Sequence, residues 1–156
     1  MKTKIGGIVQ TAHLARISLA CSPEQAQIAG DLLEALGHAH INVQFIIQCR
    51  DRNENDLMVF CVDLDDRVGA QQILRSLQDD RAISFFEVDP QVTCLGIYGP
   101  DFRIRAGLAG YLLRSLEADE IDIQAISTSL STFSMVIPSS QVDQALAIIH
   151  QNFDLP

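Results

Sequence analysis

The chain resembles itself when it is shifted by 80 residues. Residues 32–36 (Leu-Leu-Glu-Ala-Leu) then align with residues 112–116 (Leu-Leu-Arg-Ser-Leu). Residues 41–44 (Ile-Asn-Val-Gln) likewise align with residues 121–124 (Ile-Asp-Ile-Gln). Because the apolar positions stay in register, the match predicts a duplicated supersecondary unit.

The first copy shows the pattern strand, helix, strand, strand, helix, strand. Ser22-Pro23-Glu24 indicates a helix start, because it combines a hydroxyl N-cap, a proline at the first helical position and an acid in the first turn. Ile28, Leu32 and Leu36 continue this helix as one apolar face. The other expected elements are strands over 14–20, 41–48, 57–64 and 83–88, a hairpin loop over 51–56 and a helix over 68–77.

The second copy repeats this order but stops before its last strand. The expected elements are strands over 92–98, 121–128 and 131–137, a helix that ends near residue 116 and a helix from about 141 to 153. Residues 4–9 form an unassigned strand at the other end of the chain. An open sheet edge leaves backbone groups unpaired, so we expect this strand to complete the second sheet.

These patterns predict an α+β fold of two ferredoxin-like βαββαβ units with antiparallel sheets. The first unit comprises residues 14–89, and the second comprises residues 1–10 plus 91–156. We expect Ile5, Ile8 and Val9 to pack against the second unit, so that removal of residues 1–10 unfolds the protein cooperatively.

Composition excludes several classes of function. The 156 residues are 47% hydrophobic and 20% charged, which is typical of a globular protein. A formal net charge of −9 disfavours binding to nucleic acid or to anionic membrane surfaces. No signal peptide is recognised, and the apolar runs are too short to span a bilayer, which predicts a cytoplasmic protein.

Neither the cysteines nor the histidines form a metal or catalytic motif in the sequence. Four single cysteines lack C-x-x-C spacing and are expected to be small hydrophobic residues. His38 and His40 lie in a turn without an accompanying ligand cluster, and the acids Glu117, Asp119 and Glu120 match no calcium loop. We therefore expect no metal, no cofactor and no catalytic residue.

The order of several short motifs resembles a pair of ACT domains, and more narrowly the C-terminal regulatory region of aspartokinases without the kinase domain. The residues that carry this resemblance are Ile41-Asn42-Val43 with Gln48, Ile121-Asp122-Ile123 with 126–129 (Ile-Ser-Thr-Ser), the closing 152–155 (Asn-Phe-Asp-Leu) and the leading 5–9 (Ile-Gly-Gly-Ile-Val). Lys4-Ile5-Gly6-Gly7 is also similar to the start of the aspartokinase catalytic domain, but we interpret it as a strand.

The resemblance implies a non-catalytic regulatory module that binds a free amino acid of the lysine or threonine class at unit interfaces. It further implies a homodimer and a possible separate enzyme partner. Backbone groups and a helix N-terminus would hold the ligand without a charged side chain. The implied ligand-binding residues are Glu24, Gln25, Ala26, Gln27, Asn42, Val43, Gln48, Asp122 and Ile123.

Other interpretations of these residues stay open. Asn42 and Asp122 follow helix–strand connections, where both residue types are favoured turn formers. The hydroxyl-rich stretch 127–134 is typical either of a ligand-binding interface or of the solvated face of a sheet. The Asp-x-Pro-Gly loop common in ACT domains is absent, since residues 24–27 read Glu-Gln-Ala-Gln. The alternative function is therefore an ACT-type dimerisation module with vestigial ligand sites.

Overall fold

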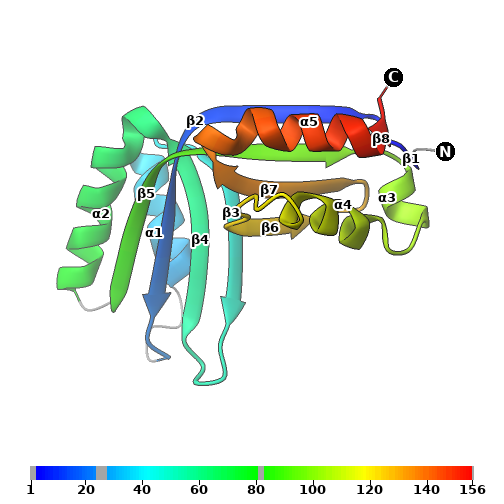
Figure 1. The fold of residues 1–156 in the computed structure, drawn as a ribbon. Helices are drawn as coiled ribbons and strands as arrows, with labels where there is room; N and C mark the ends of the chain where they lie inside the picture. Colours follow the sequence, from blue (N-terminus) through cyan, green and yellow to red (C-terminus); the bar gives the residue numbers. More distant parts are fainter. Residues whose placement is uncertain (1–2, 24–27, 81–82, 156) are drawn as a thin grey trace. The chain divides into compact units, whose positions relative to one another are not determined.

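The computed structural model describes residues 3–23, 28–80 and 83–155. The chain divides into two compact units, one made of residues 1–12 with 92–156 and one made of residues 13–91. Two long strands, β2 (Gly7–Cys21) and β5 (Phe85–Tyr98), each contribute residues to both units (Figure 1). Below, the two units are called the 13–91 unit and the 92–156 unit.

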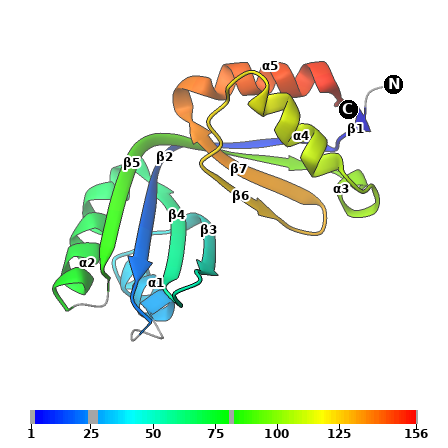
Figure 2. The ribbon, with the colours of Figure 1, turned by 60° about the horizontal axis from the view of Figure 1, so that its bottom comes forward.

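The 13–91 unit has a four-stranded sheet in the order β3-β4-β2-β5. Figures 1 and 2 show its two helices on one face of that sheet. Leu32, Leu36 and Leu74 are fully buried against the strands, as the four-residue apolar spacing predicts. The elements are α1 (Ile28–His38), β3 (Val43–Arg50), β4 (Asp56–Asp63), the 3-10 turn η1 (Leu64–Asp66) and α2 (Arg67–Asp79).

The 92–156 unit repeats this arrangement in the order β2-β5-β7-β6. Leu112 and Leu116, the repeat partners of Leu32 and Leu36, are also fully buried. The elements are α3 (Asp101–Ile104), α4 (Leu108–Glu117), β6 (Ala125–Thr128), β7 (Thr132–Pro138), the 3-10 turn η2 (Ser139–Gln141) and α5 (Val142–Asn152). The α+β fold of two ferredoxin-like units is thus confirmed.

The N-terminal segment is part of the 92–156 unit. Strand β1 (Thr3–Lys4) pairs in parallel with β8 (Phe153–Asp154), and the Ile5 N–H donates to the Asp154 carbonyl over 2.9 Å. Ile5 is buried in the core of this unit, and Ile8 packs partly against it. The expectation for Val9 is wrong: its side chain is 56% exposed, because alternate residues of a strand point to opposite faces.

The separate strands expected at the unit boundaries are continuous in the structure. Residues 7–9 and 14–20 fall in the one strand β2, and residues 85–88 and 92–98 fall in β5. His13 in β2 and Gln91 in β5 each have a left-handed backbone, with φ of 60° and 63°. These two residues are the first and last residues of the 13–91 unit, and residue periodicity gives no signal for them.

Three other elements differ from the sequence prediction. The strand expected over 121–128 begins only at Ala125, since residues 121–124 are held by other contacts described below. Pro23 lies in a turn, and α1 is described from Ile28 onward. The short helix α3 occupies a stretch that was expected to be loop. No helix of the described residues is long and apolar enough to cross a membrane.

Candidate functional site

Each unit has a pocket at an equivalent place in its fold. In the 13–91 unit, a cavity of about 430 Å³ lies where the N-terminus of α1 meets the end of β3 and the start of β4. We call it the α1–β3 pocket. Its lining residues are Ile28, Ala29, Gly30, Asp31, Glu34, Gln48 and Asp56.

The corresponding cavity of the 92–156 unit, the α4–β6 pocket, has a volume of about 280 Å³. Leu108, Ala109 and Thr128 line it at the positions that the 80-residue repeat assigns to Ile28, Ala29 and Gln48. Duplication of the fold has thus duplicated the hollow between the first helix and the second strand of each unit. The remaining lining residues are Phe102, Arg105, Ala106, Gly107, Ser129, Thr132 and Phe133.

The two pockets differ in charge. Three carboxylic acids line the α1–β3 pocket: Asp31 and Glu34, one turn apart on α1, and Asp56 at the start of β4. The α4–β6 pocket has Arg105 and hydroxyl side chains and no acid among its described lining residues. Acidic side chains attract a cationic group, so the first pocket favours a cation-bearing ligand more strongly than the second.

Asp56 is the most buried of these acids, with 8% of its surface exposed. Its Oδ1 accepts a hydrogen bond of 3.0 Å from Arg50 Nε, and this bond raises the pKa of the Arg50 guanidinium. The hairpin that places Asp56 beside Gln48 is fixed by Asp51, whose carboxylate accepts hydrogen bonds from the backbone N–H groups of Asn53 and Asn55. The hydrogen bond from the Asn55 side chain, followed by these backbone hydrogen bonds, lowers the pKa of Asp51.

Several site residues were predicted in the 13–91 unit. Of those that the structure describes, only Gln48 lines the α1–β3 pocket. Asn42 is exposed just before β3, and Val43 is half-buried at its first position. Five residues of strand, roughly 16 Å, separate Val43 from Gln48. The α1–β3 pocket is therefore formed without Asn42 and Val43. The predicted residues Glu24, Gln25, Ala26 and Gln27 lie outside the described part of the chain.

In the 92–156 unit, Asp122 is held by contacts within its own unit. Its backbone N–H donates to Gln141 Oε1 over 2.8 Å, and Gln141 Nε2 donates to the Glu120 carbonyl over 3.1 Å. The Asp122 carboxylate also accepts a hydrogen bond of 3.1 Å from Gln124 Nε2. Ile123 is half-buried beside it and packs against the core. The Asp122 amide consequently already has an acceptor.

The sequence analysis did not identify the acids of the α1–β3 pocket or Arg105 of the α4–β6 pocket. The hydroxyl residues of the α4–β6 pocket lie in the stretch 127–134, for which a ligand-binding interface was one of the two interpretations. Two signals in the sequence point to some of these lining residues. Asp31 and Glu34 are three residues apart near the start of a helix, so they share a face. Thr128 stands 80 residues after Gln48, at the position that the repeat makes equivalent. Asp56 had no such signal, because its burial depends on strand pairing.

The segment that contains most of the α4–β6 pocket matches a known family. Residues 95–153 match the family model described as ACT domain. The predicted resemblance of the chain to ACT proteins is thereby confirmed, and the 13–91 unit repeats the ferredoxin-like topology of the matched unit.

The curated proteins that are similar to almost the whole chain are aspartate kinases. The aspartate kinase of Pseudomonas putida is 28% identical over 153 residues, and that of Stutzerimonas stutzeri is 26% identical over 151 residues. Each alignment covers 97% of this chain but only 37% of the relative. The chain thus spans little more than a third of the length of these curated relatives.

Two solved structures match almost end to end. The regulatory subunit of aspartate kinase from Thermus thermophilus, in its ligand-free form, has a TM-score of 0.85 and 24% identity, covering 97% of this chain and 100% of that one. A structure of aspartokinase alpha and beta subunits has a TM-score of 0.83 and 28% identity, covering 95% and 97%. The resemblance to the regulatory region of aspartokinase is therefore confirmed.

Proposed function

We propose that this chain is a non-catalytic regulatory module that binds a free amino acid in the α1–β3 pocket. The observation that supports the proposal most directly is the chemistry of that pocket. It combines Gln48, whose amide N–H groups donate to a carboxylate, with the acids Asp31 and Glu34, which favour ammonium groups. A free amino acid carries both kinds of group.

The acids further favour a ligand with a second positive charge. Because Asp56 is already paired with Arg50, the carboxylates left for a ligand are Asp31 and Glu34: one matches the α-ammonium group of an amino acid and the other matches a cationic side chain. Within the lysine or threonine class implied by the aspartokinase resemblance, we therefore propose lysine for the α1–β3 pocket. Gln48 supplies both a donor and an acceptor at the same end of the pocket.

The remaining predicted residues are proposed to act from a second copy of the chain. Asn42 and Val43 lie at the far end of β3 from Gln48. By analogy with ACT pairs that bind ligands at interfaces, a homodimer would bring these backbone groups to a ligand. Glu24–Gln27 directly precede the lining residue Ile28 and are proposed to cover the bound carboxylate. The signal would pass to a separate enzyme by a shift between two arrangements of the units.

A thermal-shift screen against the twenty amino acids, followed by calorimetry, tests the proposal. Lysine at 100 times its dissociation constant is expected to stabilise the protein by roughly 2.7 kcal/mol. Glu34→Gln and Gln48→Ala should weaken binding by about tenfold or more, because each removes a charged or hydrogen-bonding partner worth roughly 1.5–3 kcal/mol. Asp79→Asn, an exposed acid at the end of α2, serves as the matched control.

A second candidate, an ACT-type dimerisation module with vestigial sites, is favoured by the state of Asp122. Its amide is hydrogen-bonded to Gln141, so the 92–156 unit offers one backbone donor fewer to a ligand. No thermal shift with any amino acid at millimolar concentration, together with a stable dimer in sedimentation, would favour this candidate over the sensor.

A further inference from the structure

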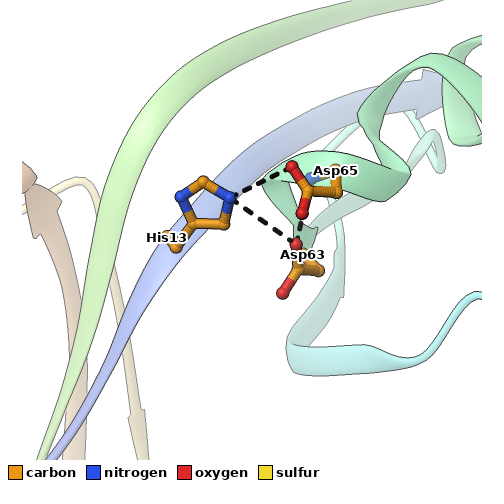
Figure 3. Close-up of side chains that lie close together, drawn as sticks. All are labelled: His13, Asp63 and Asp65. Atoms are coloured by element: carbon orange, nitrogen blue, oxygen red, sulfur yellow. Dashed lines mark hydrogen bonds and ion pairs between the residues drawn. The ribbon is translucent and has the colours of Figure 1, made fainter.

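His13, Asp63 and Asp65 meet on the surface of the 13–91 unit (Figure 3). His13 lies in β2, Asp63 is the last residue of β4, and Asp65 lies in the 3-10 turn η1. Figure 3 shows the imidazole ring facing both carboxylates. Within residues 3–23, 28–80 and 83–155, this is the one group of three such side chains whose ligand atoms all lie within 4.8 Å of one another.

The spacing of the three ligand atoms is close to what one metal ion requires. His13 Nε2 lies 3.2 Å from Asp65 Oδ1 and 4.0 Å from Asp63 Oδ1. Atoms that bind one ion at about 2.1 Å are roughly 3.0–3.4 Å apart. The first distance already fits, and the second needs to shorten by well under 1 Å. The adjustment falls to the His13 side chain, which is 56% exposed, because Asp63 Oδ1 is held by a hydrogen bond of 2.9 Å from the Asp65 backbone N–H.

Asp63 has a structural contact of its own, because its carboxylate caps η1; the equivalent turn η2 of the other copy forms without a side-chain cap, so the turn does not depend on that contact. The strand pairing makes Gln91, Pro138 and Ser140 the counterparts of His13, Asp63 and Asp65. The backbone is the same at both places: φ is 60° at His13 and 63° at Gln91, and φ/ψ are −56°/141° at Asp63 and −57°/137° at Pro138. One copy has three metal-ligating side chains where the other has none.

We propose that His13, Asp63 and Asp65 form a binding site for a divalent transition-metal ion of the Zn²⁺ type. Two carboxylates and a neutral imidazole carry a formal charge of −2, which such an ion neutralises. The imidazole selects zinc, nickel, cobalt or copper over magnesium and calcium, which prefer oxygen ligands. Both His13 and Asp63 are about half exposed, so water completes the coordination. The site is independent of the amino-acid pocket.

The test is calorimetry of the full, tag-free chain with Zn²⁺ and, separately, with Mg²⁺. We expect one Zn²⁺ per chain in the wild type and no comparable Mg²⁺ binding. His13→Gln should weaken Zn²⁺ binding by about tenfold or more. Glutamine is tolerated there, since Gln91 has the same backbone conformation. Asp65→Asn, which changes an exposed side chain that caps no helix, should weaken binding as well.

Two controls separate this site from other zinc ligands on the surface. His38→Gln removes an exposed histidine outside the cluster, and Cys49→Ser removes the exposed thiol. Both variants should bind Zn²⁺ as the wild type does. The proposal is overturned if His13→Gln retains wild-type affinity, if Cys49→Ser or His38→Gln abolishes binding, or if Zn²⁺ and Mg²⁺ bind the wild type equally.

Discussion

At the scale of single residues, the cysteines differ sharply in their surroundings. Cys21 is fully buried at the end of β2, opposite Asp56 in the strand pairing. Burial, and secondarily the Asp56 charge, raise the pKa of the Cys21 thiol to about 11. Burial also raises the pKa of Cys94, whereas Cys49 is exposed on β3. The exposed thiol should therefore react faster than the buried thiols with raised pKa.

A thiol reagent at pH 8 is expected to modify Cys49 first. Only about one in a thousand Cys21 side chains is then a thiolate, since its pKa lies roughly three units higher. Cys94 should react more slowly than Cys49, and Cys21 and Cys61 only upon unfolding. Mass spectrometry after timed labelling measures the order. Persistence of the fast reaction in Cys49→Ser would contradict this assignment.

The raised pKa of Cys21 also predicts the direction of an alkaline effect on stability. The folded state keeps the proton that the unfolded state releases near pH 9, so the stabilising contribution is complete below pH 9. It is lost as the pH rises from 9 through about 11. Urea unfolding across this range should show a steeper loss of stability in the wild type than in Cys21→Ala.

At the scale of elements, the N-terminal segment contributes directly to the core of the 92–156 unit. Ile5 is 4% exposed in that core, and the Gly6 N–H donates to the Tyr98 carbonyl over 2.6 Å. Ile5→Ala should lower the free energy of unfolding by about 2–5 kcal/mol, the usual range for a large apolar core side chain. Val9→Ala, at an exposed position of β2, should change it by less than about 0.5 kcal/mol.

Removal of residues 1–10 should have a larger effect than either substitution. It takes away Ile5, the β1–β8 pairing and the first part of β2 together. Circular dichroism during heating should show a truncated protein without a cooperative native transition. A truncated protein that melts like the wild type would mean that these contacts are dispensable.

The helices and most strands were predictable because each has a periodic apolar face. Ile28, Leu32 and Leu36 are all buried, as their spacing indicates. The continuity of β2 and β5 was not predictable. Both strands contain a residue with a left-handed backbone, His13 and Gln91, and neither residue type is specific to that conformation. The late start of β6 was not predictable either: ahead of it, the Asp122 N–H donates to Gln141 Oε1, 19 positions away in the sequence.

At the scale of the whole molecule, the duplicated fold contains two unlike pockets. Divergence at the lining positions has left acids in the α1–β3 pocket and Arg105 with hydroxyl groups in the α4–β6 pocket. Calorimetry with lysine is therefore expected to give one bound ligand per chain. Two bound lysine molecules per chain would show that the difference in charge between the pockets does not determine which pocket binds lysine.

The site was less predictable than the fold. The repeat and the resemblance pointed to Gln48, which does line a pocket. They gave no indication of Asp56, whose position depends on the register between β3 and β4, or of the cluster of His13, Asp63 and Asp65. Residues some 50 positions apart become neighbours only through strand pairing, and a single sequence does not contain that information.

The path of the chain through β2 and β5 has a consequence for genetic exchange. The 13–91 unit is continuous in sequence, whereas the 92–156 unit also needs the first dozen residues. Two crossovers, one at each end of residues 13–91, therefore exchange the first unit as one cassette, whereas no contiguous segment carries the whole of the second. Since β2 and β5 are neighbours in the sheet, joining residue 12 to residue 92 through a two-residue Asn-Gly turn would excise the cassette and leave a minimal one-unit protein.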